Sequence, residues 1–106
     1  MSSAEKQFFQ LIEALTENKN VVSGQMFGKQ CLKIKGKAFL ALHKSALVFK
    51  LSGEEHKNAM SNIGAVLWDP SGKGRPMKEW VAIPVENLGN ARLFANQALS
   101  YVSKSA

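Results

Sequence analysis

Three short apolar segments between Gln30 and Leu51 dominate the hydrophobic pattern of the chain. Turn-forming residues separate them, first Lys35-Gly36-Lys37 and then His43-Lys44-Ser45. Short runs rich in Leu, Ile, Val and Phe between such breaks are typical of strands joined by hairpins. The pattern therefore predicts a three-stranded antiparallel meander, and the other elements can be placed relative to it.

The alternation of side chains predicts the register of this meander. A three-residue loop at 35–37 puts Leu32 opposite Leu40, and a two-residue loop at 44–45 puts Leu40 opposite Phe49. A slip of one residue would move every side chain to the other face, so a continuous apolar face supports this register. One predicted face is apolar throughout: Leu32, Ile34, Ala38, Leu40, Leu42, Leu47, Phe49 and Leu51. The opposite face, called the reverse face below, carries Cys31, Lys33, Lys35, Phe39, Ala41, His43, Ala46, Val48 and Lys50.

Helical spacing and capping residues predict three helices outside the meander. The first begins at Ser2 or Ser3 with a Ser2–Glu5 capping box, and the second begins at Ser52 with Glu55 three residues later. They end near residues 18 and 61, and a third helix runs from about 86 to 102. Residues 65–68 and 80–83 predict two further strands.

Grouped strands without a βαβ alternation indicate an antiparallel sheet covered by helices. The order helix, three strands, helix, two strands, helix therefore predicts a single α+β domain over residues 1–106. We expect a two-layer α/β sandwich in which the amphipathic first and third helices cover the apolar face. The reverse face is then left partly open.

Three sequence segments can be compared with a known family. They are Met26-Phe27-Gly28, the Lys35–Phe39 turn into a strand, and Lys73-Gly74-Arg75-Pro76-Met77 followed by Trp80–Pro84. From about residue 20 onward the chain resembles the TfoX/Sxy N-terminal domain family. The resemblance implies the same element order, which YjbR-like proteins share, and a shape related to type III secretion chaperones. The family is associated with competence regulation, and members made of this domain alone mostly have no assigned activity, so the resemblance implies no catalytic residue.

Composition is that of an ordinary soluble domain, with 45% hydrophobic and 21% charged residues in 106. No apolar run approaches the roughly 20 residues of a membrane span, and no export signal is visible. One cysteine cannot form an internal disulfide. We therefore expect a cytoplasmic protein with no membrane contact and no cofactor.

The net charge of +6 is concentrated in two segments. Residues 29–50 contain six lysines and no acid, and residues 72–80 add Lys73, Arg75 and Lys78 against Glu79. Such a field can attract phosphates or acidic proteins. Lysines on exposed strands also prevent edge-to-edge aggregation, and solubility is the simpler explanation of this excess.

The segment Gly72-Lys73-Gly74-Arg75 invites comparison with a phosphate-binding loop. That motif requires a strand before it and a helix after it, whereas two strands flank this segment and Pro76 removes one N–H donor. Consecutive amides near Lys73, Gly74 and Arg75 could still form a concave nest for an anion. These three residues are therefore a candidate anion-binding loop.

Two further groups of residues suggest chemistry only faintly. Cys31 and His43 share the reverse face, but no oxyanion site or orienting group accompanies them, so we expect no enzyme. Trp68 and Trp80 flank the basic loop and could stack nucleobases if exposed, although packing is the usual role of such residues.

The reverse face supplies the main functional hypothesis. Its predicted apolar centre, surrounded by lysines, is typical of an interaction surface: Lys33, Lys35, Phe39, Ala41, Val48 and Lys50. We expect a small binding or regulatory domain that contacts an unidentified protein partner or a second copy of itself. The alternative, which is not favoured, is sequence-independent nucleic-acid binding through the meander and residues 72–80.

Overall fold

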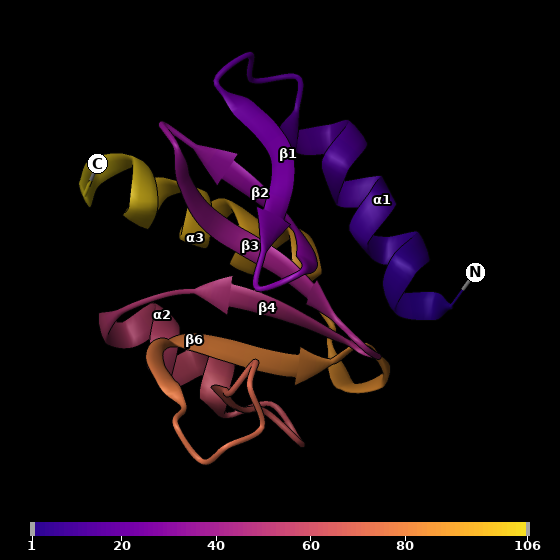
Figure 1. The fold of residues 1–106 in the computed structure, drawn as a ribbon, viewed down its shortest axis with the longest axis vertical. Helices are drawn as coiled ribbons and strands as arrows, with labels where there is room; N and C mark the ends of the chain where they lie inside the picture. Colours follow the sequence, from indigo (N-terminus) through magenta and orange to yellow (C-terminus); the bar gives the residue numbers. More distant parts are fainter. Residues whose placement is uncertain (1, 106) are drawn as a thin grey trace.

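The computed structural model describes residues 2–105 and combines helices with one antiparallel sheet (Figure 1). The helices are α1 (Ser3–Leu15), α2 (Gly53–Met60) and α3 (Ala91–Ser105), with a 3₁₀ turn, η1 (Val85–Asn87). The strands are β1 (Val21–Met26), β2 (Lys29–Ile34), β3 (Lys37–His43), β4 (Ala46–Lys50), β5 (Val66–Trp68) and β6 (Met77–Pro84). They form a six-stranded sheet in the order β1-β2-β3-β4-β6-β5, which confirms the α+β class.

Strand β1 is an addition to the predicted elements. The pattern predicts only a connection there, because Ser23 and Gly24 interrupt the apolar run and glycine disfavours strands. In the structure β1 pairs with β2 along its length, from Val21 opposite Ile34 to Met26 opposite Lys29. Four strands rather than three therefore lie between α1 and α2, and the predicted element order is corrected accordingly.

The β2–β3 hairpin departs from the predicted register by one residue. Lys35 and Gly36 form a two-residue turn with φ of 52° and 79°, so Ile34 pairs with Lys37 rather than with Ala38. Two-residue turns with positive φ match the twist of a hairpin, which favours this shorter loop. A β-bulge then leaves Phe39 without a partner on β2, and Leu32 pairs with Leu40 as predicted.

The bulge exchanges the faces of two neighbouring residues. Phe39 enters the core that the helices cover, and Ala38 packs on the reverse face. The remaining predicted core positions of the meander are confirmed, as is the β3–β4 register with His43 opposite Ala46. The Ser2–Glu5 capping box also forms, whereas Ser52 occupies the N-cap of α2 without a side-chain capping bond.

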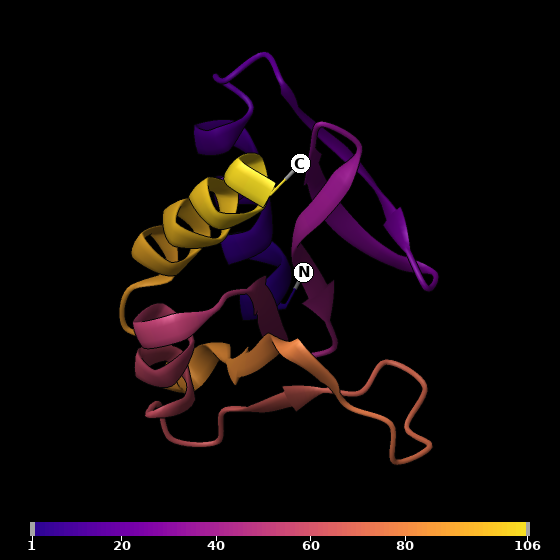
Figure 2. The same cartoon turned by 90° about the vertical axis from the view of Figure 1, so that its left-hand side faces the viewer.

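The reverse face has a small core of its own, formed by Cys31, Ala41, Val48, Trp68, Trp80 and Ala82. The Trp68 and Trp80 rings lie 5.4 Å apart between centroids. The ring of Phe27, on the β1–β2 turn, contacts the ring of Trp68 on the opposite edge of the sheet, with 6.2 Å between the ring centroids. Figure 2 shows the helices on one side of the sheet and both outer hairpins projecting to the other. The sheet is therefore curled, so that its two ends meet over this second cluster.

Candidate functional site

The predicted apolar centre of the reverse face is not exposed. Phe39, Ala41 and Val48 each have 0% of their surface accessible, so the prediction that they form a contact surface is wrong. Phe39 faces the helices because of the bulge, and the other two lie in the cluster that contains both tryptophans. Of the predicted rim, Lys35 lies toward the helices, where its Nζ donates to the Ser103 carbonyl oxygen at 3.3 Å.

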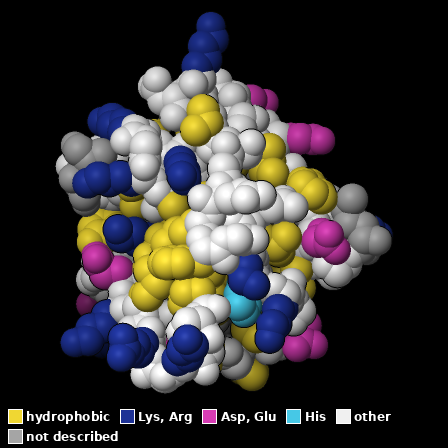
Figure 3. All heavy atoms as spheres, viewed as in Figure 1, with side chains coloured by type: hydrophobic (Ala, Val, Ile, Leu, Met, Phe, Trp, Pro, Cys, Tyr) yellow, Lys and Arg dark blue, Asp and Glu magenta, His cyan; other side chains and the backbone are white. Residues whose placement is uncertain are grey.

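The other two rim lysines, Lys33 and Lys50, lie together with Lys37 around a hollow on the reverse face. This cationic hollow, as we call it, has a volume of about 420 Å³ and is lined by Gln25, Met26, Lys33, Gly36, Lys37, Ala38, Lys50, Met77 and Trp80. Figure 3 shows hydrophobic atoms gathered on this side of the molecule, with Lys and Arg side chains around them. The lining residues include three lysines and no acidic residue.

Three different strands supply these lysines. Lys33 comes from β2, Lys37 begins β3 and Lys50 ends β4. Lys33 and Lys50 are only partly exposed, which is expected where the aliphatic stem of a lysine covers apolar surface and its ammonium reaches water. The convergence thus depends on the pairing of β2 with β3 and of β3 with β4.

Gly24 makes room for one of these side chains. A Cβ placed at Gly24 would lie 3.2 Å from Cε and 3.6 Å from Nζ of Lys33. Glycine within a strand often marks such a close approach. The Lys33 ammonium therefore lies over β1, at the rim of the cationic hollow.

The cationic hollow is suited to an anion that carries an apolar group. Three like charges with no carboxylate among them attract an anion, because it relieves their mutual repulsion. Each exposed ion pair contributes only about 0.2–1 kcal/mol, so a bare anion would bind weakly. The partly exposed Met26 and Met77 can add apolar contact, and methionine adapts readily to different partners.

The predicted anion-binding loop, Lys73–Arg75, already surrounds a carboxylate of its own chain. The side chain of Asp69 accepts hydrogen bonds from the amides of Gly72, Gly74 and Arg75 and from the Ser71 hydroxyl, at 3.1, 2.8, 3.2 and 2.9 Å. Desolvation raises the pKa of Asp69, but these hydrogen bonds together outweigh it and hold the pKa below its usual value. The predicted nest of amides exists, but Asp69 occupies it, so the prediction of a site open to an external anion is wrong.

The other predicted chemical groups are wholly or partly buried. Cys31 is fully buried, and desolvation raises the pKa of its thiol despite the nearby Lys33, so the thiol stays protonated at neutral pH. The His43 ring packs against Trp68, and desolvation with Lys29 and Lys44 lowers its pKa. Trp68 and Trp80 are 2% and 4% exposed, so they offer no platform for nucleobases.

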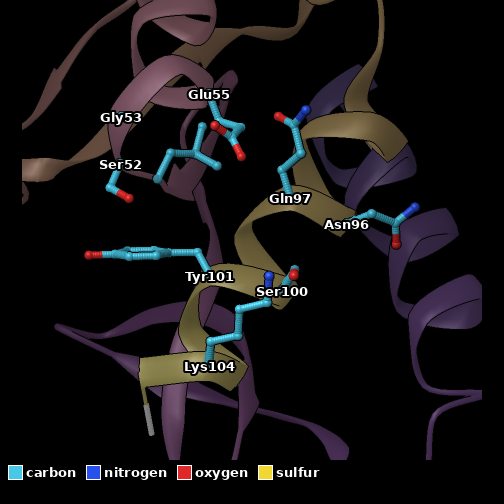
Figure 4. A pocket seen from close by; sticks show the side chains of 9 residues that line it. Ser52, Gly53, Glu55, Asn96, Gln97, Ser100, Tyr101 and Lys104 are labelled. Carbon is cyan, nitrogen blue, oxygen red and sulfur yellow. The ribbon is translucent and has the colours of Figure 1, made fainter.

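A second hollow, of about 410 Å³, lies between the start of α2 and α3 (Figure 4). The side chains of Glu55 and Gln97 point into it from opposite helices, and Lys104 lines its far end. The Tyr101 hydroxyl donates to a carboxylate oxygen of Glu79. Because charges of both signs line this hollow, it lacks the electrostatic preference of the cationic hollow.

No family model, curated protein or solved structure matched this chain in the comparisons with known proteins. The resemblance to the TfoX N-terminal domain therefore stays a prediction. Within residues 2–105 no helix is both long enough and apolar enough to cross a membrane. The same residues contain no cluster of three or more His, Cys, Asp or Glu side chains that could hold a metal ion.

Proposed function

We propose that this protein is a non-catalytic binding domain that recognises an acidic segment of a partner protein at the cationic hollow. The observation that carries the proposal is the convergence of Lys33, Lys37 and Lys50 over an apolar floor with no carboxylate in the lining. A cytoplasmic location, a regulatory role and kinship with TfoX-like two-layer domains belong to the same proposal.

The residues that line the cationic hollow favour a protein partner over a nucleic acid. Proteins that bind single strands combine a basic groove with exposed aromatic rings, and both tryptophans here are buried. Met26 and Met77 offer a floor on which an apolar side chain can pack beside a carboxylate. An acidic peptide with apolar residues satisfies both parts of this lining.

Nucleic-acid binding stays as the second candidate, because Lys73, Arg75 and Lys78 add exposed positive charge on the β5–β6 hairpin. Suppose that each of the three lysines of the hollow met one phosphate of duplex DNA. A log–log plot of affinity against salt concentration would then have a slope of about −3. A peptide with fewer charges would show a shallower dependence.

The proposal can be tested by fluorescence anisotropy with a labelled peptide of Glu and Val residues. We expect saturable binding that weakens at least tenfold in the triple variant Lys33→Ala/Lys37→Ala/Lys50→Ala. The matched control is Lys19→Ala/Lys57→Ala/Lys104→Ala, which removes the same charge from outside the hollow and should bind as the wild type does.

The same assay separates the alternatives. Labelled duplex and single-stranded DNA across a salt series should show no saturable binding at physiological salt. Tight DNA binding with the steep slope, or equal losses of peptide binding in both triple variants, would overturn the proposal.

A further inference from the structure

We propose that the acidic partner binds as an extended segment that adds a strand to the free edge of β1. This inference rests on the proposed function for the charge of the partner. It adds the backbone conformation of the partner, the strand that holds it and the pattern of its side chains.

The outer side of β1 offers backbone groups for such pairing. β1 is the terminal strand of the sheet and pairs with β2 alone among the described residues. Met26 and Lys29 flank a two-residue turn and so form a hydrogen-bonded pair. In an antiparallel ladder such pairs alternate with pairs whose backbone groups point away from the neighbouring strand. Ser23 and Gln25 therefore direct their N–H and C=O groups outward. Val21 follows the same alternation, because its N–H donates to the Asn18 carbonyl oxygen at 3.0 Å instead of to β2.

The two edges of the sheet differ in how they are protected. Natural edge strands are commonly blocked by lysine, proline, a bulge or short length. β5, at the other edge, has three residues and a register shift. β1 has six residues, Val21–Met26, with neither a charge nor a proline among them. It is thus the edge that can accept a strand.

Hollows flank β1 on both faces. On the reverse face Gln25 and Met26 line the cationic hollow, and the Lys33 ammonium lies over Gly24. On the helix side lies a hollow of about 380 Å³ in which α1 faces β1 and β2, lined by Phe8, Phe9, Ile12, Ser23, Gly24, Gln25, Gln30 and Cys31. Successive side chains of an added strand point to opposite faces. One set would therefore meet Lys33, and the other would meet Phe9 and Ile12.

These surroundings define the partner as a segment of alternating acidic and apolar residues. Backbone pairing provides affinity and the alternate hollows provide specificity, as in other cases of strand addition. A second copy of this chain fits less well, because it would bring the same lysines and a net charge of +6 against this edge.

The first test compares labelled peptides of equal composition by fluorescence anisotropy. A peptide of alternating Glu and Val should bind at least tenfold more tightly than one with its Glu and Val residues in two blocks. Two further peptides carry N-methyl groups at alternate residues, one at the odd and one at the even positions. Binding should be abolished in the peptide whose methylated amides face β1 and should be nearly unchanged in the other.

The second test changes β1 itself. Ser23→Pro removes an outward N–H without removing a bond to β2, so the fold should persist, as circular dichroism would show, while binding falls at least tenfold. Ser23→Ala keeps the N–H and should bind as the wild type does. In the unaltered protein, the peptide should slow hydrogen exchange at the Ser23 and Gln25 amides.

The outcomes distinguish this inference from the proposed function. Binding that needs Lys33, Lys37 and Lys50 but is insensitive to Ser23→Pro, with no new amide protection, would overturn strand addition and leave the acidic partner standing. Failure of every acidic peptide to bind would overturn both. Concentration-dependent dimerisation that protects the same amides without peptide would assign the edge to a second copy instead.

Discussion

At the scale of single residues, the place of Phe39 in the core depends on the β-bulge in β3. Its ring is fully buried in the core formed by the sheet, α1 and α3, and only the bulge directs it there. A polar substitution at this position would place an unpaired group in that core.

Replacing Phe39 with Ala should therefore lower the free energy of unfolding by about 3–5 kcal/mol, because it leaves a cavity in close-packed surroundings. Val22→Ala is the control, since Val22 is 52% exposed and should change stability by no more than about 0.5 kcal/mol. Urea denaturation of both variants measures the difference. Equal costs would contradict the placement of Phe39 in the core.

At the scale of elements, the β5–β6 loop is ordered by one carboxylate. Asp69 gathers the amides of Gly72, Gly74 and Arg75 around itself, and the Ser71 hydroxyl completes the arrangement. Backbone amides of this loop thus surround an internal anion, and the loop needs no external anion to hold its shape.

This arrangement predicts a response to acid. The pKa of Asp69 in the folded chain is lowered from 3.8, so its contribution to stability is present above that value. The contribution is lost as the pH falls through the lower, folded-state pKa. The Gly74 amide resonance, followed by NMR, should therefore shift with a midpoint below 3.8. Asp69→Asn should abolish this transition, and a midpoint at or above the ordinary value would contradict the hydrogen-bonded arrangement.

Local chemistry made several elements predictable from the sequence. The Ser2–Glu5 capping box and the two-residue turn at Lys44-Ser45 act over a few residues, and both form as predicted. β1 and the bulge at Phe39 depend on more distant partners. β1 is held by pairing with β2 despite Ser23 and Gly24, and the bulge reconciles a short turn with the Leu32–Leu40 pair.

At the scale of the whole molecule, the curl of the sheet decides which surfaces exist. The sequence predicted that Lys33 and Lys50 share the reverse face, and the structure places both at the cationic hollow. Lys37 and Met77 could not be assigned to the same site, because they come together only when six strands pair and curl. The same curl buries the tryptophans that the sequence left as candidates for exposure.

The contact between Phe27 and Trp68 should help to hold this curl closed. In a Trp80→Phe background, Trp68 is the single tryptophan and can be excited selectively, and Phe27→Ala should then increase quenching of Trp68 fluorescence by acrylamide. Leu93→Ala, at a residue of α3 that is 45% exposed, is the control and should leave quenching unchanged. Unchanged quenching in Phe27→Ala would show that the curl persists without this ring.

The meeting of the two sheet ends also has a consequence for how the chain folds. The β1–β2 and β3–β4 hairpins join neighbours in sequence through two-residue turns, so closing them costs little chain entropy. The contact of Phe27 with Trp68 joins the first hairpin to the last, across all the intervening strands. Non-local contacts of this kind slow folding. The hairpins can thus form early. The reverse-face core around Trp68 and Trp80 forms only when β5 pairs with β6. Trp68 therefore reports on completion of the fold rather than on its beginning.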